Sequence, residues 1–329
     1  MALRDYQQEH PTQVSFLLET IKGHQMHHAY LFYGPEGVGK ASLAREYGKA
    51  IICREKGKDA CNSCLFCRRV DSYNHPDLQE ILPEDNYLRI DQIRDFQREL
   101  FYRPYEADKK VYILQDAHLM REEAQNCLLK TLEEPPDYAV LILITNNRDG
   151  LLPTVISRCH QVLFSPLSTE ILCRKLREKF DLSEERAFIY SRLSEGSLTR
   201  ASQLVEEEEV WARREEIVTF FLRLHRSGYT DAFLTLEEMV KKYGERMDEV
   251  FRTFLSLFRD LLLLQEGGSD RELINYDYRE DLLLLTRDYH QGELERVIRQ
   301  TEKTHNDLKR HALKQLALES YWLKIRRKG

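Results

Sequence analysis

Residues 29–47 read AYLFYGPEGVGKASLAREY, and this stretch decides the fold of the chain. Its apolar run, Tyr30–Tyr33, predicts a buried strand of a parallel sheet, because such strands are covered on both faces. Three glycines and a run of good helix formers follow the strand: Gly34, Gly37, Gly39 and Lys40–Tyr47. The stretch therefore predicts a strand, a glycine-rich turn and a helix, the local unit of a doubly wound α/β layer.

The spacing Gly34-x4-Gly39-Lys40 is the pattern of a phosphate-binding loop. In such a loop, successive backbone N–H groups point at a phosphate, and the lysine neutralises the β and γ oxygens. We therefore predict an ATP-binding site made of Gly34, Gly37, Gly39, Lys40, Ala41 and Ser42. The alternative is a glycine-rich turn from strand to helix that binds no ligand.

One position of the loop departs from the pattern. The residue after the lysine should be Ser or Thr, whose hydroxyl holds Mg²⁺, and here it is Ala41. Ser42 is one position late, about 100° further round the helix, so it is not a simple substitute. The sequence thus favours nucleotide binding with impaired Mg²⁺ coordination, and it argues against full Mg²⁺-dependent hydrolysis.

Composition sets the class of protein. The chain has 329 residues, which predicts two or three globular domains. Charged residues make up 32% of it and the net charge is −6, which excludes a protein that binds nucleic acid through an overall positive charge. No apolar run approaches the roughly 20 residues of a membrane span. The start, MALRDYQQEH, lacks the apolar core of a signal peptide. We therefore expect a cytoplasmic protein with no membrane partner.

Four cysteines follow the loop helix in the order Cys53-x7-Cys61-x2-Cys64-x2-Cys67. Disulfides are rare in the cytoplasm, so a cluster of cysteine thiols there indicates a metal site. This spacing suits a tetrahedral four-thiolate zinc site, and four protein ligands leave no open position for catalysis. The alternatives are an iron–sulfur centre or a chance group of reduced cysteines.

Further apolar runs alternate with helical segments up to Pro166. Strands are expected at 78–82, 111–115, 139–145 and 162–164, with helices at 12–23, 90–102 and 121–134. From Thr169 onward every periodic segment looks helical, and aromatic residues such as Phe220, Phe221 and Phe254 fall at the spacing of a bundle core.

Four segments in this order carry a family resemblance: HHAYLFYGPEGVGK, CNSCLFC, NCLLKTLEEPP (Asn126–Pro136) and LLPTVISRC (Leu151–Cys159). Together they resemble the bacterial sliding-clamp loader ATPases of the AAA+ class, which include the delta-prime and gamma/tau types of DNA polymerase III subunit. The resemblance implies an AAA+ module with an inserted zinc site over 1–166, a helical lid over 167–208 and a helical collar over 209–329 that joins five subunits in a ring. It also implies gamma/tau and delta subunits as partners, and the sliding clamp and primed DNA contacted through the complex.

Departures from the family pattern choose between its branches. The resemblance implies that an active member has Asp-Glu after the third strand, where the Asp binds Mg²⁺ and the Glu activates the attacking water. In this chain the two positions are Gln115 and Asp116. The lid pattern G-S-x-R reads Gly196-Ser197-Leu198-Thr199-Arg200, with the arginine one position late. With Ala41, these changes predict a delta-prime-type component of the polymerase holoenzyme that does not hydrolyse ATP itself, rather than the longer gamma/tau motor.

Arg158, in Ser157-Arg158-Cys159, is the predicted catalytic residue. The resemblance implies that this arginine reaches a neighbouring subunit's ATP as a finger, and a guanidinium suits the task because it stays charged and offers a planar fork to phosphate. The alternative from the residues alone is a loop arginine paired with a carboxylate.

Two other functions stay open. An autonomous AAA+ ATPase is opposed by Ala41 and Gln115, and turnover by the purified chain would restore it. A zinc-dependent DNA-binding module is opposed by the near-neutral charge, although Arg68, Arg69 and the tail 324–328 leave local positive charge. Steep salt-dependent DNA affinity would support that module.

Overall fold

The computed structural model describes residues 1–23, 25–55, 57–85, 87–290, 292–309 and 313–326. The chain forms two compact units. Unit 1 comprises Met1–Ile171 with Gly196–Thr199, and unit 2 comprises Leu172–Glu195 with Arg200–Gly329. In the part of the chain that the structure describes, no helix is both long and apolar enough to cross a bilayer.

Unit 1 is built on a sheet of five parallel strands in the order β2-β3-β4-β1-β5. The strands are β1 (Ala29–Tyr33), β2 (Leu78–Ile81), β3 (Lys110–Leu114), β4 (Ala139–Thr145) and β5 (His160–Leu163). The predicted parallel sheet is confirmed, with β5 beginning two residues earlier than expected. The central strands β3 and β4 are buried along their whole length, which explains their unbroken apolar runs.

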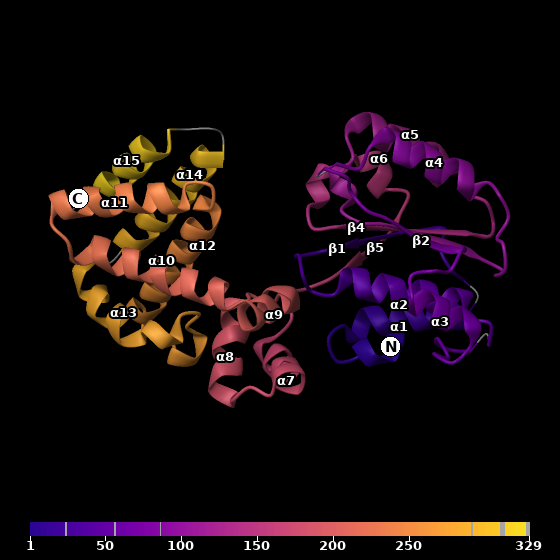
Figure 1. Ribbon diagram of the computed structural model, residues 1–329, viewed down its shortest axis with the longest axis horizontal. Helices are drawn as coiled ribbons and strands as arrows, with labels where there is room; N and C mark the ends of the chain where they lie inside the picture. The colour runs from indigo at the N-terminus through magenta and orange to yellow at the C-terminus, as the bar shows by residue number, and fades with distance from the viewer. Residues whose placement is uncertain (24, 56, 86, 291, 310–312, 327–329) are drawn as a thin grey trace. The chain divides into compact units, whose positions relative to one another are not determined.

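Helices cover both faces of the sheet, as Figure 1 shows. One face carries α1 (Pro11–Lys22), α2 (Lys40–Ile52) and α3 (Leu65–Asp71), and the other carries α4 (Ile90–Leu100), α5 (Glu122–Glu133) and α6 (Pro153–Ile156). Alternate residues of β1 enter the two cores: Tyr30 and Phe32 pack with α1 and α2, while Leu31 packs with α4 and α5. This arrangement is the doubly wound layer that the sequence predicts.

The parallel sheet brings three chain segments to one edge. The carboxyl ends of β1, β3 and β4 lead into the loop at 34–39, into Gln115 and Asp116, and into Asn146. Neighbouring parallel strands end at the same edge of a sheet, where ligands of open α/β folds bind. The fold therefore brings the segments of the predicted nucleotide site to one edge of the sheet.

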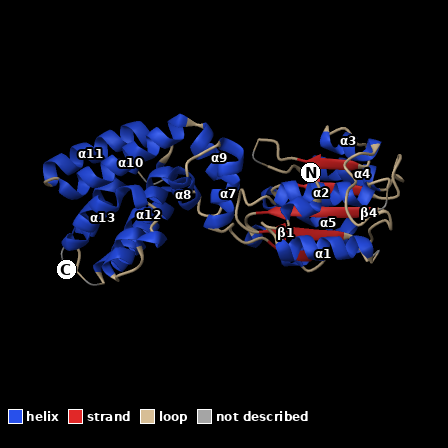
Figure 2. Ribbon diagram, turned by 90° about the horizontal axis from the view of Figure 1, so that it is seen from below, coloured by secondary structure: helices blue, strands red, loops and turns tan. Residues whose placement is uncertain are grey.

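Everything described after β5 is helical or irregular, with no strand, as Figure 2 shows by colour. The first helices are α7 (Thr169–Phe180), α8 (Glu184–Leu193) and α9 (Leu198–Glu206). Longer helices follow: α10 (Glu208–Arg226), α11 (Tyr229–Tyr243), α12 (Met247–Gln265), α13 (Arg279–Leu285), α14 (Glu293–Lys309) and α15 (Lys314–Arg326). The aromatics predicted as bundle core are buried, with Phe220, Phe221 and Phe254 in one apolar cluster with Trp322.

Candidate nucleotide site, cysteine cluster and interface arginine

The loop at 34–39 depends on glycine at two points. Gly34 has φ +145° and Gly37 has φ +74°, both in the region that favours glycine. A Cβ at Gly34 would stand 2.1 Å from the carbonyl oxygen of Phe164, and one at Gly37 would stand 2.1 Å from Oγ of Ser197. The glycines therefore serve both the backbone curl and the close approach of two neighbouring segments.

Lys40 is the first residue of α2, and its side chain folds back over the loop. Its Nζ lies 2.7 Å from the carbonyl oxygen of Gly34 and 2.5 Å from that of Pro35. Burial lowers the pKa of Lys40 to about 8, and the opposing charge of Asp116 raises it only in part. A phosphate bound in this loop would therefore compete with the carbonyl oxygens of Gly34 and Pro35 for the ammonium group of Lys40.

Two other segments of unit 1 brace the same loop. Nε2 of His10 lies 2.7 Å from the carbonyl oxygen of Val38, and the ring is buried. The backbone N–H groups of Leu198 and Thr199 donate to the carbonyl oxygen of Gly37 at 2.9 and 3.3 Å. The loop is thus fixed from three directions. No local pattern pointed to His10, because it lies 28 residues from Val38 in the chain.

The positions that should hold Mg²⁺ are engaged elsewhere. Nε2 of Gln115 donates to Oε2 of Glu80 at 2.8 Å, and the other oxygen of Glu80 pairs with Nε of Arg45 at 2.5 Å. Ala41 offers only a methyl group, which packs on the apolar core. The Ser42 hydroxyl faces Tyr6; burial raises the pKa of that phenol, and this hydroxyl opposes the rise.

At the end of β4, Thr145 adds a polar group that the sequence analysis missed. It is buried, and its Oγ1 lies 3.1 Å from Nδ1 of His118 and accepts from the backbone N–H of Asn147 at 3.0 Å. Asp116, two residues before His118, has φ +48°, so the chain turns through a left-handed conformation after β3. Thr145 and Asp116 are far apart in sequence, and they are related because β3 and β4 are neighbouring parallel strands that end at the same edge of the sheet.

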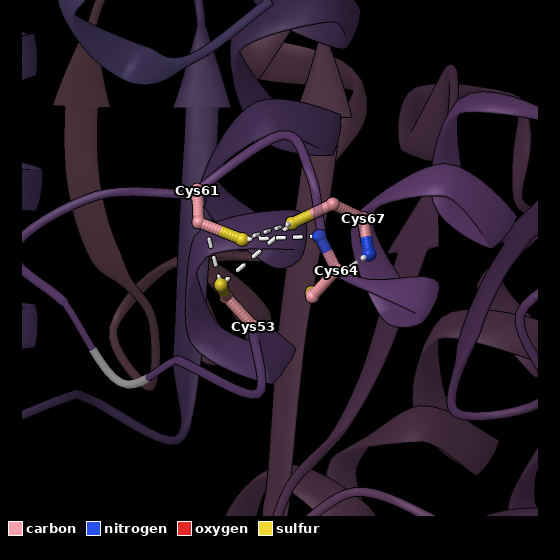
Figure 3. Close-up of side chains that lie close together, drawn as sticks. All are labelled: Cys53, Cys61, Cys64 and Cys67. Carbon is pink, nitrogen blue, oxygen red and sulfur yellow. Dashed lines mark hydrogen bonds between the residues drawn. The ribbon is translucent and has the colours of Figure 1, made fainter.

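The four predicted metal ligands come together in space, as Figure 3 shows. Their Sγ atoms all lie within 4.8 Å of one another. Sγ of Cys67 is 3.9 Å from that of Cys61 and 3.7 Å from that of Cys53. A tetrahedral zinc with bonds of about 2.3 Å sets its sulfurs about 3.8 Å apart. The donor set therefore fits such an ion.

Backbone and hydroxyl donors surround the sulfurs. The N–H groups of Cys61, Cys64 and Cys67 point at the sulfurs of Cys53, Cys61 and Cys64, at 3.4, 3.3 and 3.4 Å. The Ser63 hydroxyl lowers the pKa of the Cys61 thiol to about 6, whereas burial raises the pKa of Cys67. Such donors stabilise thiolate ligands and orient them.

The cysteine loop also holds the start of the chain. Oδ1 of Asp59 accepts from the backbone N–H of Leu3 and Oδ2 from that of Arg4, each at 3.1 Å. Nζ of Lys49, fully buried, reaches the carbonyl oxygen of Met1 at 2.5 Å and the carboxylate of Asp71 at 2.8 Å. These contacts fix the short helix η1 (Leu3–Tyr6) beside α2.

Arg158 lies directly after α6 and is engaged on two sides. Its Nη2 lies 2.6 Å from Oε1 of Glu133, and its Nη1 donates to the carbonyl oxygen of Thr154 at 2.8 Å. The arginine side chain is 34% exposed and that of Glu133 is 50% exposed. Arg158 therefore pairs with a carboxylate, as the alternative from the residues alone predicts, and its side chain stays partly exposed; its role as a finger stays a prediction.

The local positive charge near the cysteines is largely engaged. Nη1 of Arg69 pairs with Oε2 of Glu106 at 2.6 Å, and Nε of Arg68 donates to the carbonyl oxygen of Ser63 at 3.0 Å. Residues 327 and 328 of the basic tail lie outside the described ranges. This part of the molecule therefore offers little support for a separate DNA-binding module.

Family models and sequence relatives identify one family for this chain. A model described as DNA polymerase III, delta subunit, matches residues 9–168, and one described as DNA polymerase III, delta subunit, C terminal, matches residues 208–327. The delta-prime subunit of DNA polymerase III from Bacillus subtilis is 31% identical over 263 residues, 79% of each chain. The tau subunit from the same organism is 27% identical, and the match covers 92% of this chain and 57% of tau. A solved gamma subunit-related protein from Thermotoga maritima aligns with 96% of this chain and 99% of its own, with 21% identity and a TM-score of 0.46.

Proposed function

This chain belongs to the family of DNA polymerase III delta-prime subunits, and on that premise we propose that it acts as a delta-prime-type subunit of the clamp loader. In this role it helps to place the sliding clamp on primed DNA during replication. It does so as a component of an assembly with gamma/tau and delta subunits. We assign residues 1–166, the larger part of unit 1, to the AAA+ module, residues 167–208 to a helical lid, and residues 209–329 to the collar that joins the subunits in a ring.

We propose that the chain does not hydrolyse ATP on its own. The observation that carries this proposal is the bond from Gln115 to Glu80, next to Ala41 in a loop that otherwise keeps its glycines and lysine. Gln115 is neutral and already committed to a carboxylate, and a methyl group cannot hold a cation. Both protein contacts to Mg²⁺ are therefore missing, and Mg²⁺ neutralises charge during phosphoryl transfer. The loop then binds nucleotide weakly and almost independently of Mg²⁺.

The proposed catalytic contribution is Arg158, acting in trans. Its exposed guanidinium is suited to the γ-phosphate held by a neighbouring subunit, where charge develops during transfer. Arginine fingers of this kind contribute on the order of 10³-fold or more in rate. The active sites of the complex then belong to gamma/tau, and this chain completes one of them.

We propose that Cys53, Cys61, Cys64 and Cys67 hold one structural zinc ion. The sulfur spacing and the four-thiolate set support zinc, and four protein ligands leave the ion no open coordination position for catalysis. When bound, zinc supplies folding energy to the loop between α2 and α3. The chain's own part is to hold the thiolates and to tie the loop to the N-terminal segment through Asp59.

The test compares two variants in the complete complex with clamp and primed DNA. Arg158→Ala is expected to lower ATP turnover and clamp loading while ring assembly and metal content stay unchanged. Arg158→Lys should rescue poorly, because an ammonium lacks the planar fork. Lys40→Ala in this chain should change turnover little. The opposite pattern, together with turnover by the purified chain alone, would show an autonomous ATPase instead.

A further inference from the structure

The guanidinium of Arg158 is held between two helices that are themselves fastened together. Glu133 is the last residue of α5, and Thr154 lies in α6. The buried side chain of Gln125 joins these helices: its Nε2 donates to the carbonyl oxygen of Gly150 at 3.0 Å, and its Oε1 accepts from the N–H of Leu152 at 2.7 Å. The two anchors of Arg158 therefore sit on one rigid frame within unit 1.

The anchors use only part of the arginine. A guanidinium has five N–H donors. One goes to Glu133 and one to Thr154, and the other three have no acceptor in the part of the chain that the structure describes. The side chain is still 34% exposed. The two bonds thus fix the plane of the guanidinium without consuming the donors that a phosphate would take.

We propose that Glu133 is a positioning residue for Arg158, holding the guanidinium ready for a phosphate presented by an adjoining subunit. The inference rests on the proposed trans role of Arg158. An unheld arginine has to lose its rotamer freedom when it engages the phosphate, and a side chain that is already ordered avoids that loss. The Glu133 carboxylate is half exposed, so water screens its charge and leaves the arginine attractive to phosphate.

Glu133 has a matched control beside it. Glu134 is also an exposed carboxylate, and it forms no ion pair with any described residue. Glu133→Ala removes the anchor, and Glu134→Ala removes one equal charge from the same surface. Glu133→Gln keeps an acceptor oxygen while losing the charge, so it is the conservative variant. None of the three changes alters Arg158, the loop at 34–39 or the cysteines.

The first measurement is made on the isolated full chain. With ¹⁵N-labelled arginine, NMR reports the rotation and hydrogen exchange of the Arg158 side chain. We expect restricted rotation in the unmodified chain, in Glu134→Ala and in Glu133→Gln, and clearly faster rotation in Glu133→Ala, where only the bond to the Thr154 carbonyl oxygen remains. If Arg158 rotates as freely in the unmodified chain as in Glu133→Ala, the positioning role is wrong.

The second measurement is ATP turnover by the complete complex containing each variant. We expect Glu133→Ala to lower kcat about tenfold with KM for ATP unchanged, a loss of orientation rather than of the cation. Glu133→Gln should retain most of kcat, and Glu133→Ala combined with Arg158→Ala should be no slower than Arg158→Ala alone. An unchanged or raised kcat in Glu133→Ala, or an equal loss on top of Arg158→Ala, would overturn the inference. If Arg158→Ala leaves ATP turnover unchanged while the NMR difference between Glu133→Ala and the unmodified chain persists, the trans role of Arg158 is wrong. Glu133 would then position Arg158 without any effect on catalysis.

Discussion

Nε2 of Gln115 lies 2.8 Å from Oε2 of Glu80, on the neighbouring strand β2. The same carboxylate pairs with Arg45 of α2, whose guanidinium lies 3.6 Å from the ring centre of Tyr73. A neutral amide at position 115 therefore completes a network that joins α2, β2 and β3. An aspartate here would be too short to make this hydrogen bond and would bring a second negative charge near the Glu80 carboxylate. The loss of the expected Mg²⁺ ligand is thus tied to the packing of the sheet edge.

Gln115→Asp is expected to destabilise the chain rather than restore a metal site. The side chain of Glu80 is only 14% exposed, so the like-charge contact is poorly screened and should cost about 1–3 kcal/mol of unfolding free energy. Urea unfolding measures this cost, and calorimetry with and without Mg²⁺ tests for a metal site. The double change Glu80→Gln with Gln115→Asp removes the like-charge contact and should recover part of the stability, although it also removes the ion pair between Glu80 and Arg45. A strong gain of Mg²⁺-dependent nucleotide binding in Gln115→Asp would contradict this account.

Nucleotide binding by the loop should be weak, nearly independent of Mg²⁺, and sensitive to pH above 8. The pKa of Lys40 is about 8 because of burial, and a bound phosphate favours the charged form. Binding then takes up a proton above pH 8, so affinity should fall up to about tenfold per pH unit there and stay flat below it. Titration calorimetry over pH 7–10 measures this. Strong dependence on Mg²⁺ would mean that Ser42 or Asp116 holds the ion.

The same shift has a consequence for stability, with a definite sign. The pKa of Lys40 is lowered from its ordinary 10.5, so the folded chain loses the proton before the unfolded chain does. The unfolded state binds more protons between about pH 8 and 10.5, and the Lys40 contribution to stability therefore rises with pH in that window. Lys40→Met should remove this rise when unfolding is compared at pH 7.5 and 10. A rise of equal size in Lys40→Met would assign it to another group.

Metal analysis of the purified chain should find one zinc ion per chain and no visible absorption. Cys64→Ser should lose the zinc and destabilise unit 1, because metal binding contributes folding free energy. Cys127→Ser is the matched control, since Cys127 lies outside the cluster and its Sγ donates to Oε1 of Gln97. Iron with visible absorption, or no metal, would refute the zinc site.

Asp59→Ala should release the N-terminal segment without emptying the metal site. Asp59 accepts from the N–H groups of Leu3 and Arg4 and is not a thiolate ligand, so its loss should expose these amides and cost about 1–2 kcal/mol. Hydrogen exchange of residues 3–6 and zinc content are the two readouts. Fast exchange with full zinc is the expected pair, and unchanged exchange would show that Lys49 alone holds the segment.

In unit 2, His225 makes the helical bundle sensitive to acid. Its Nδ1 lies 2.8 Å from the carbonyl oxygen of Phe221, so Nδ1 carries the proton and Nε2 accepts from the Tyr289 hydroxyl at 2.6 Å. Burial lowers the pKa of His225 to about 4, so the unfolded state binds more protons between pH 6.5 and 4 and the bundle loses stability as pH falls through that window. His225→Gln should flatten this dependence in urea titrations at pH 4–7.

The sequence alone determined the parallel strands, the glycine-rich loop between β1 and α2, the cysteine quartet and the helical remainder. Each is encoded by short-range patterns: apolar runs for buried strands, glycines before a lysine, thiols at x2 spacing, and apolar residues at helical period. Each of these patterns lies within a single helix, strand or loop, so it can be recognised from the sequence without knowledge of the tertiary structure. The start of β5 was misjudged by two residues and its end by one, because an edge strand with exposed alternate residues has a weak pattern.

Only the tertiary structure decided how these elements meet. Glu80 reaches Gln115 across 35 residues, His10 reaches Val38 across 28, and Glu133 reaches Arg158 across 25. No local periodicity links such pairs, because their distance is set by the strand order β2-β3-β4-β1-β5 and by the helices packed on each face. The partner of a side chain depends on which helix or strand packs next to its own element. That packing is decided by the whole fold, because helices must cover both faces of the sheet.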